Sequence, residues 1–325
     1  MSIFAQVSII KTDNSLIATI YKSTGSWYVA KAENGIFYNT RIKGKFKIEG
    51  LTTTNPIAVG DVVDIELEEG EEKVATIIHI HDRKNYIVRT SAHNRNQRHI
   101  VAANLDQALL FVGLRDPKTS TGFMDRFLAA AEAWHVPTNL IVNKSDTFRD
   151  KEWAIFEKIK IVYEPLGYGV FPLSLETKEG LTEVMATLSD KTTLISGQSG
   201  IGKSTFINGV LPDENIRTQE VSAWSGKGLH TTTFAQMYDL KTGNGRIIDT
   251  PGIREFGITN DIEAAELSHY FPEMRARIHD CRFNNCLHVN EPGCAVKDAV
   301  ENSEIALDRY MSYLNILDSL PKKNY

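Results

Sequence analysis

A stretch of eight residues in the second half of the chain matches a pattern that binds phosphate groups. The stretch Gly197-Gln-Ser-Gly-Ile-Gly-Lys203-Ser204 fits the consensus G-x-x-x-x-G-K-S. Its glycines let the backbone wrap phosphates with N–H groups turned inward, and the following helix adds a positive dipole. In this pattern the lysine contacts the β and γ phosphates, and the serine hydroxyl binds Mg²⁺. The candidate phosphate-binding residues are Gly197, Gln198, Ser199, Gly200, Ile201, Gly202, Lys203, Ser204 and Thr205.

Two further stretches supply groups for a Mg²⁺ site. Asp249-Thr-Pro-Gly252 ends a predicted strand, where the carboxylate can hold Mg²⁺ and the Gly252 N–H can meet the γ-phosphate. Thr232 is the candidate hydroxyl ligand from the triplet 231–233, although either neighbouring threonine could serve. A D-T-P-G turn and a Thr triplet are common when they stand alone, so both assignments depend on the phosphate-binding loop.

A fourth stretch indicates which base the nucleotide carries. Asn143-Lys-Ser-Asp146 follows the apolar segment 140–142. A carboxylate there can accept both guanine donors, N1–H and the exocyclic amine, which adenine does not present in that arrangement. An N-cap at Ser145 or Asp146 would explain the motif in isolation, but beside a phosphate-binding loop the combination favours guanine. The candidate base-binding residues are Asn143, Lys144, Ser145, Asp146, Ser174 and Leu175.

The three cysteines of the chain lie close together near its end. With one histidine they supply three thiolates and an imidazole, a complete tetrahedral set for one structural Zn²⁺. Three buried cysteines beside a surface histidine are the alternative explanation. The odd number of cysteines argues against a disulfide framework and favours a cytoplasmic protein. The candidate zinc ligands are Cys281, Cys286, His288 and Cys294.

Strands alternate with helices in the part of the chain that carries the nucleotide motifs. Strand patterns occupy 108–112, 140–142, 170–173, 193–196 and 246–249, and helical patterns occupy 124–134, 151–163, 181–188 and 203–210. This alternation predicts an α/β domain over 101–258, with a mainly parallel sheet and helices on both faces. Residues 259–325 are expected to form a mainly helical zinc-binding module with a helix near 303–320.

Residues 1–85 carry five short β patterns, which predict an oligonucleotide-binding (OB) type barrel. Four cations alternate with apolar residues in one of them and therefore share a face. A solvated outer face is the commoner explanation, but on such a barrel the row could follow a phosphate backbone. The acidic run 61–72 is expected elsewhere on the barrel, and 86–100 as a basic linker or loop. The candidate RNA contacts are Arg41, Lys43, Lys45 and Lys47.

The composition is compatible with this prediction of a multi-domain protein. The chain has 325 residues, of which 42% are hydrophobic and 24% charged, as in ordinary globular proteins. We expect no membrane-spanning helix and no secretory signal. The net charge of −5 averages acidic and basic segments, so it does not argue against nucleic-acid binding by a local patch.

The order of the motifs points to one family. The base-reading motif comes first, then the phosphate-binding loop, the Thr triplet and D-T-P-G, which is the order of circularly permuted GTPases. With a barrel in front and a Cys/His cluster behind, essentially the whole chain resembles the ribosome small-subunit-dependent GTPase A family (RsgA, also called YjeQ). A second permuted family, of the YlqF type, lacks the barrel and the cluster and ranks below it.

The resemblance implies a GTPase that binds the small ribosomal subunit and its rRNA and assists late maturation of that subunit. It implies GTP or GDP, Mg²⁺ and one structural Zn²⁺; we also expect a monomer and no membrane partner. A nucleotide-gated RNA-binding protein without significant catalysis is the competing function, and a metabolic P-loop kinase is disfavoured by the guanine motif.

Hydrolysis is expected to be slow until the subunit stimulates it. Ile253 stands where many GTPases place a glutamine that orients water, and the resembling family departs in the same way. His230 is the candidate for positioning the water, beside Lys203 and Gly252 as catalytic residues. An ordinary exposed loop histidine is the alternative explanation for His230.

Overall fold

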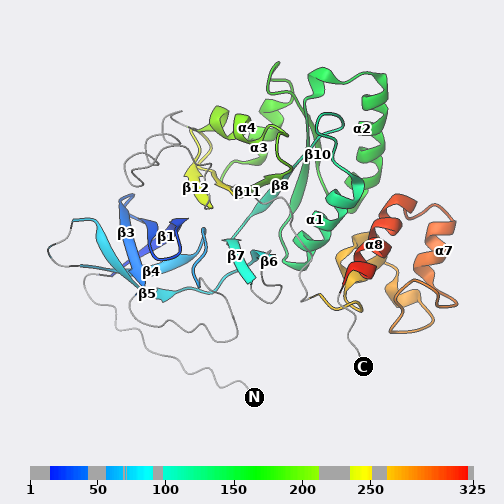
Figure 1. Ribbon diagram of the computed structural model, residues 1–325, viewed down its shortest axis with the longest axis horizontal. Helices are drawn as coiled ribbons and strands as arrows, with labels where there is room; N and C mark the ends of the chain where they lie inside the picture. Colours follow the sequence, from blue (N-terminus) through cyan, green and yellow to red (C-terminus); the bar gives the residue numbers. More distant parts are fainter. Residues whose placement is uncertain are drawn as a thin grey trace.

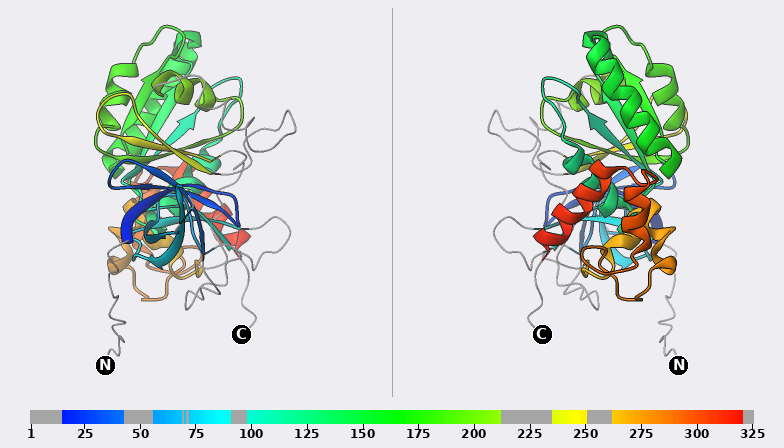
Figure 2. Two further views of the ribbon diagram at one scale, coloured as in Figure 1. Left: turned by 90° about the vertical axis from the view of Figure 1, so that its left-hand side faces the viewer. Right: turned by 90° about the vertical axis from the view of Figure 1, so that its right-hand side faces the viewer.

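Three units are visible in the chain: an N-terminal barrel, a central sheet covered by helices, and a C-terminal helical module (Figure 1). The computed structural model describes residues 15–42, 56–68, 70, 72–90, 98–211, 235–250 and 262–320. The barrel and the C-terminal module lie at opposite ends of the longest axis, and both side views place them beneath the central unit (Figure 2).

The N-terminal strands close into a five-stranded barrel, as predicted. Their order is β1-β2-β3-β5-β4, and an additional β1–β4 pairing closes the ring. The β3–β5 pairing is parallel, whereas the others are antiparallel. Alternate residues point inward to an apolar core that includes Ile20, Tyr28 and Ile65. The strands are β1 (Ser15–Ser23), β2 (Tyr28–Ala32), β3 (Phe37–Ile42), β4 (Val62–Leu67) and β5 (Val74–Ile80).

Arg41 stands on the outer face of β3, as its alternation predicted, but it is already paired. Its guanidinium donates two hydrogen bonds to the Glu68 carboxylate, at 3.1 and 2.6 Å, and lies over the Trp27 ring. The expectation that the acidic run lies elsewhere is therefore wrong at Glu68, because β5 brings the end of β4 beside β3. Lys43, Lys45 and Lys47 lie outside the described residues.

Two strands occupy the region in which we expected a linker or loop. β6 (Tyr86–Thr90) pairs antiparallel with β7 (Arg98–Ala103), and residues 91–97 between them lie outside the described residues. Just before β6, Arg83 and Asp61 form a bidentate ion pair with both side chains almost fully buried. After β7, the Asn104 side chain donates to the Gly60 carbonyl at 2.9 Å. These contacts fix the barrel to the start of the central unit.

The central sheet is mainly parallel, as predicted, in the order β10-β9-β8-β11-β13-β12. Its antiparallel strand, β12, is too short and polar to have been predicted. The strands are β8 (Gln107–Val112), β9 (Thr138–Asn143), β10 (Val170–Leu173), β11 (Thr192–Gly197), β12 (Gln236–Asp239) and β13 (Arg246–Asp249).

Helices cover both faces of this sheet (Figure 1). α1 (Thr121–Ala133) and α2 (Asp150–Tyr163) pack on one face, while α3 (Leu181–Thr187) and α4 (Lys203–Val210) pack on the other. The 3₁₀ turns Ser145–Thr147 and Glu164–Leu166 follow β9 and α2. Among the described helices, none is long and apolar enough to cross a membrane.

The barrel continues the central sheet through β12. Lys22 of β1 pairs with Gln236, so the two sheets share one hydrogen-bonded edge. Asp239 at the end of β12 accepts a hydrogen bond from the Tyr21 hydroxyl at 2.7 Å and forms an ion pair with Lys31 at 2.6 Å. Burial, and the bond to Asp239, raise the pKa of Tyr21 above its ordinary value.

The C-terminal module is helical, as predicted, and packs on the outer face of α1. The module contains α6 (Pro272–Arg275), α7 (Ala295–Glu301) and α8 (Leu307–Ser319), with 3₁₀ turns at Leu267–Tyr270 and Ile278–Asp280. Two small residues of α1, Ala129 and Ala130, belong to the apolar core of the module. Because their side chains are short, α8 can approach α1 closely.

A buried charge fixes α8 to α1. The Arg309 side chain is 2% exposed and donates to Asp125 Oδ1 at 2.7 Å and to both oxygens of Glu273 at 2.7 and 3.1 Å. Its guanidinium also lies 4.7 Å from the centre of the Phe271 ring. Burial opposes the charged form, but the two carboxylates outweigh it and raise the pKa of Arg309. Tyr163 of α2 donates to the same Asp125 oxygen at 2.6 Å.

Replacing this arginine should destabilise the protein far more than replacing an exposed one. Arg309→Met leaves two carboxylates buried without their partner, so the free energy of unfolding should fall by about 3–5 kcal/mol. Arg277→Met is the matched control in the same module, since its ion pair with Glu304 is exposed and should be worth about 0–1 kcal/mol. Denaturant unfolding of both variants measures the difference, and equal losses would contradict the role given to Arg309.

Candidate nucleotide and metal sites

The nucleotide motifs meet at one edge of the central sheet. β8, β9, β10, β11 and β13 are parallel, so their carboxyl ends share that edge. Asn143 ends β9, Ser174 follows β10, Gly197 ends β11 and Asp249 ends β13. Their order along the chain is permuted. In the sheet, the phosphate-binding loop follows β11, whose neighbour β13 carries the Mg²⁺ carboxylate, and the guanine motif follows β9, which is one strand away from β11.

The phosphate-binding loop depends on glycines for its shape. Gly200 and Gly202 have φ values of +77° and +101°, a region that side chains disfavour. A Cβ on Gly202 would lie 2.3 Å from Asn143 Nδ2. That nitrogen donates to the Ile201 carbonyl at 2.7 Å. The first residue of the guanine motif is therefore packed directly against the phosphate-binding loop.

Lys203 lies folded onto its own loop. Its ammonium donates to the carbonyls of Gly197 and Gln198, at 2.6 and 2.7 Å. Burial lowers the pKa of Lys203, although the nearby Asp249 carboxylate acts in the opposite direction. Ser204 and Thr205 are exposed in the first turn of α4, where phosphate oxygens or Mg²⁺ could reach them. The partly desolvated cation is well placed to exchange two carbonyls for phosphate oxygens.

The guanine motif and the Ser174 loop are joined by a hydrogen bond. The Ser174 hydroxyl donates to Asp146 Oδ1 at 2.7 Å and accepts from the Thr177 N–H at 3.0 Å. This bond holds the Asp146 carboxylate while leaving the side chain exposed. Leu175 packs at the edge of the core behind the loop. The arrangement suits a carboxylate that must accept two donors from one planar base.

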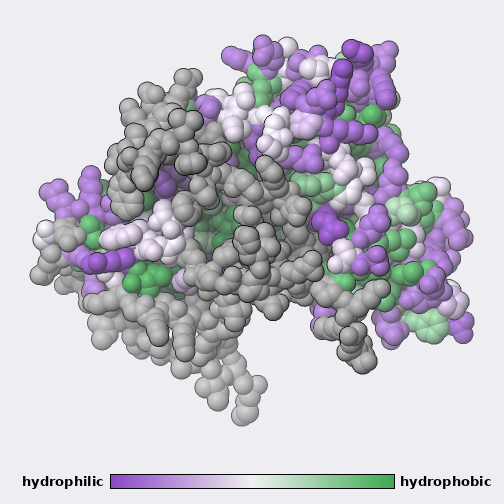
Figure 3. Space-filling model, viewed as in Figure 1, coloured by the Kyte–Doolittle hydropathy of each residue, from purple (hydrophilic) through white to green (hydrophobic). Residues whose placement is uncertain are grey.

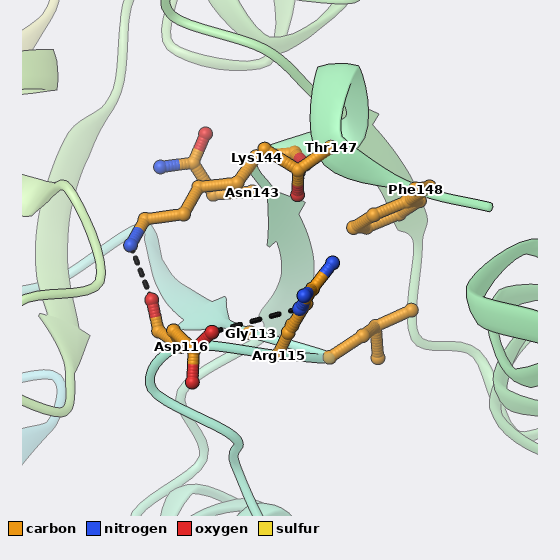
Figure 4. Close-up of a pocket in the computed structure, with 8 residues that line it drawn as sticks. Gly113, Arg115, Asp116, Asn143, Lys144, Thr147 and Phe148 are labelled. Atoms are coloured by element: carbon orange, nitrogen blue, oxygen red, sulfur yellow. Dashed lines mark hydrogen bonds and ion pairs between the residues drawn. The ribbon is translucent and has the colours of Figure 1, made fainter.

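Two buried polar atoms beside this motif have no hydrogen-bond partner among the described residues. They are Asn143 Oδ1 and Ser145 Oγ. Lys144 adopts φ +68°, which turns its side chain across the site to the Asp116 carbonyl (Figure 4). A pocket of about 210 Å³ opens beside these residues, between the loop after β8 and Phe148. Because Asn143 lines this pocket, a base edge bound there could supply a hydrogen-bond partner to its Oδ1.

The loop after β8 belongs to the site, although no motif predicted it. Thr119 Oγ1 accepts from the Gly113 N–H at 3.0 Å and donates to Gln198 Oε1 at 3.2 Å. A Cβ on Gly113 would lie 2.4 Å from Ile201 Cδ1. A signal was present in the sequence, since a glycine directly after a buried parallel strand lies at the ligand-binding edge of such sheets.

Several predicted site residues lie outside the described part of the chain. They are His230, Thr232, Gly252 and Ile253, in the stretches 212–234 and 251–261. The structure therefore describes the base-reading half of the site, the phosphate-binding loop and Asp249, and the other assignments stay predictions.

The three cysteines and the histidine come together as the spacing predicted. Their four ligand atoms lie within 4.8 Å of one another. His288 Nδ1 is 3.3 Å from the Cys294 sulfur and 3.7 Å from that of Cys281. Burial raises the pKa of Cys286 to about 12, and lowers the pKa of His288. Thiolates in such a place need a cation beside them, and a neutral imidazole is ready to bind one, so the cluster fits a tetrahedral metal such as zinc.

α8 and an acidic side chain hold the loop that carries His288. The hydroxyls of Tyr310 and Tyr313 donate to the carbonyls of His288 and Leu287, at 2.6 and 2.7 Å. Glu291 accepts from the Leu287 N–H at 2.8 Å, and its pKa is lowered by the backbone N–H groups it accepts from, although burial opposes this. The ligand loop is thus fixed by groups that do not themselves touch a metal.

A pair of glycine substitutions tests the geometry of the phosphate-binding loop. Gly202→Ala should abolish guanine-nucleotide binding, because its Cβ would collide with Asn143 and the required φ is strained. Gly209→Ala, in the helix that follows Gly202, is the control, since its Cβ would have no neighbour within 4 Å and alanine favours helix. Titration with a fluorescent guanine nucleotide measures both. Normal binding by the Gly202 variant would show that this loop does not hold the nucleotide.

Known proteins match this chain along nearly its whole length. Residues 80–259 match the family model of the RsgA GTPase, and residues 18–75 match that of the RsgA N-terminal domain. The small ribosomal subunit biogenesis GTPase RsgA of Christiangramia forsetii is 48% identical over 301 residues, which cover 92% of this chain and 95% of that relative.

Solved structures agree with this similarity. YjeQ from Thermotoga maritima superposes with a TM-score of 0.75 and 31% identity, covering 95% of this chain and all of that one. YloQ, a circularly permuted GTPase, gives a TM-score of 0.73 at 28% identity, covering 97% of this chain and 99% of that one. Sequence, permuted motif order and three-unit fold agree, and the chain belongs to the RsgA GTPase family.

Proposed function

We propose that this protein hydrolyses GTP on the small ribosomal subunit and assists the late maturation of that subunit. The observation that carries the proposal is the meeting of the guanine motif, the phosphate-binding loop and Asp249 at one sheet edge between a barrel and a metal-binding module. The names of its relatives, small ribosomal subunit biogenesis GTPases, support the choice of partner. We further propose that it acts as a monomer in the cytoplasm, with domains at 1–85, 101–258 and 259–325.

The chain's own groups account for nucleotide binding. The Asp146 carboxylate, which the Ser174 hydroxyl holds in place by a hydrogen bond, accepts the two guanine donors. Lys203 leaves the carbonyls of Gly197 and Gln198 and contacts the β and γ phosphates. Ser204 and Asp249, with Thr232, would hold Mg²⁺, which would supply charge neutralisation at the phosphates.

Hydrolysis requires a water in line with the γ-phosphate. Ile253 can neither orient nor activate it. We propose that His230 positions this water once the subunit orders the site, and that the Gly252 N–H contacts the γ-phosphate. Turnover is then slow for the free protein and fast on the subunit.

Turnover measurements test this function. Small subunits should accelerate single-turnover phosphate release by the wild-type protein. His230→Ala should lower the stimulated rate about 100-fold while GTP binding stays normal, because a positioned base contributes on this scale. Lys203→Ala should lose binding and turnover together, whereas Lys241→Ala, an exposed lysine, should change neither.

Two outcomes would contradict parts of this proposal. If subunits bind only the GTP-bound protein but never accelerate phosphate release, the protein is a nucleotide-gated binding protein. It is then not a GTPase that the subunit stimulates. If His230→Ala is stimulated as strongly as the wild-type protein, another group positions the water.

We propose that the C-terminal cluster holds one structural Zn²⁺ and that the barrel contacts rRNA. Four protein ligands leave no position open for a substrate. On the barrel, Lys43, Lys45 and Lys47 remain the candidate RNA contacts, whereas Arg41 is neutralised by Glu68.

Metal analysis tests the zinc assignment. Purified protein should carry about one zinc per chain, and Cys286→Ser should lose it and melt at a lower temperature, because structural zinc contributes folding energy directly. His279→Ala is the control, since this exposed histidine lies outside the four ligands. Equal zinc content in the Cys286 variant and the wild-type protein would overturn the assignment.

A further inference from the structure

The segment between the first two cysteines carries side chains that metal binding does not need. It reads Arg282-Phe283-Asn284-Asn285, and all four residues are exposed. Phe283 is 40% exposed, one of several large hydrophobic side chains that the C-terminal module leaves on its surface. Hydrophobic and hydrophilic residues are interspersed over this module at the right of the space-filling view (Figure 3). A phenylalanine on a short exposed loop loses contact with water only if something covers it.

This segment borders a pocket of about 290 Å³. That volume lies near the lower end of sites that hold one small ring system. Cys286 and His288, two of the metal ligands, form its buried wall. Its other polar or aromatic walls are the side chains of Ser268, His269, His279, Phe283, Asn284 and Asn285.

The side chains that line the pocket can recognise a nucleic-acid base. Amide side chains supply hydrogen-bond donors and acceptors in one plane, and the imidazole rings add further hydrogen-bonding nitrogen atoms. Among the described residues, no carboxylate, lysine or arginine lines the pocket. The side chains of His269, His279, Asn284 and Asn285 are exposed, so a bound base can replace water at their polar atoms. His288 Nε2 is buried without a hydrogen-bond partner among the described residues.

A cation lies beside the aromatic wall of the pocket. The Arg282 guanidinium is 5.4 Å from the centre of the Phe283 ring, and no ion pair engages it within the described residues. A base stacked on Phe283 would therefore have a positive charge close to its own phosphate.

The pocket is fixed in place by the metal-binding loop. The Arg282 N–H donates to the Gly293 carbonyl at 2.9 Å, and the Cys286 N–H donates to the Phe283 carbonyl at 3.3 Å. The segment is thus closed at both ends by hydrogen bonds and by two cysteines. A wall held in this way loses little conformational entropy when a ligand stacks on it.

We propose that this pocket receives one unpaired RNA base, which stacks on Phe283 and pairs through its edge with Asn284 or Asn285. Single-stranded RNA is recognised in this way, by bases splayed onto aromatic side chains and read along their edges. The inference rests on the proposed function, because the small subunit supplies the RNA. An acidic peptide would fit less well, since its carboxylates offer no planar ring that could stack on Phe283 and present a donor-and-acceptor edge to the amide side chains.

Photo-crosslinking of the full-length, zinc-loaded protein tests the proposal. The probe is a single-stranded RNA octamer with one central 4-thiouridine. In the wild-type protein it should crosslink to the peptide that contains residues 279–285. Phe283→Leu should lower that yield about tenfold, the scale of one lost base stack, and Phe283→Trp should retain it. Met311→Ala, which removes an exposed apolar side chain elsewhere on the module, is the control.

Three outcomes would contradict base binding in this pocket. If the wild-type protein crosslinks only through other peptides, or if Phe283→Leu crosslinks as well as the wild type at equal zinc content, the pocket takes no base. If Phe283→Leu weakens binding to small subunits but leaves the RNA crosslink intact, the pocket contacts a protein and the inference is wrong. Subunit-stimulated phosphate release by the wild-type protein, measured on the same preparation, shows separately whether the proposed function holds.

Discussion

The hydrogen bond from Asn143 Nδ2 to the Ile201 carbonyl joins two halves of a site that the chain order separates. The base-reading half is built before the phosphate-binding loop, so nothing in the covalent order aligns them. Alignment comes from parallel strands and from the absence of a Cβ at Gly202, which lets the amide reach the loop. The nucleotide site depends on this contact, because it sets the base-reading motif against the phosphate-binding loop. The flanking units attach beside this site, the barrel to β12 and the module to α1.

Those attachments differ in kind. The Lys31–Asp239 ion pair of the barrel is exposed and worth about 1 kcal/mol or less. The barrel is also held by the pairing of β1 with β12 and by Tyr21 and Val59, which pack into the core of the central unit. The C-terminal module is bound to α1 through Arg309, which is buried, and breaking such a pair costs several times more. The module is thus joined to α1 by a buried charge, whereas the barrel is joined to the central unit by strand pairing and apolar packing.

Sequence reasoning located the groups that the structure brings together where they lie close in the chain. The stretch 197–204, the motif 143–146 and the cluster ending at Cys294 carry their chemistry in their spacing, and the barrel and parallel sheet follow from periodicity. It missed Thr119, whose role comes from a hydrogen bond to a residue distant in the chain. It also misplaced Glu68 relative to Arg41, because pairing across an intervening strand is set by register and leaves no trace in charge alternation.

The elements that carry the two flanking units, α1 and β12, lie beside different parts of the nucleotide site. α1 begins directly after the loop that contacts Gln198, so the metal-binding module is tied to the phosphate-binding side through a rigid helix. β12 follows the stretch that carries the Thr triplet and pairs with β13, which ends at Asp249. β12 therefore lies between the strand that ends at the Mg²⁺ carboxylate and the barrel. Each flanking unit is thus joined to the nucleotide site through a different element, the module through α1 and the barrel through β12.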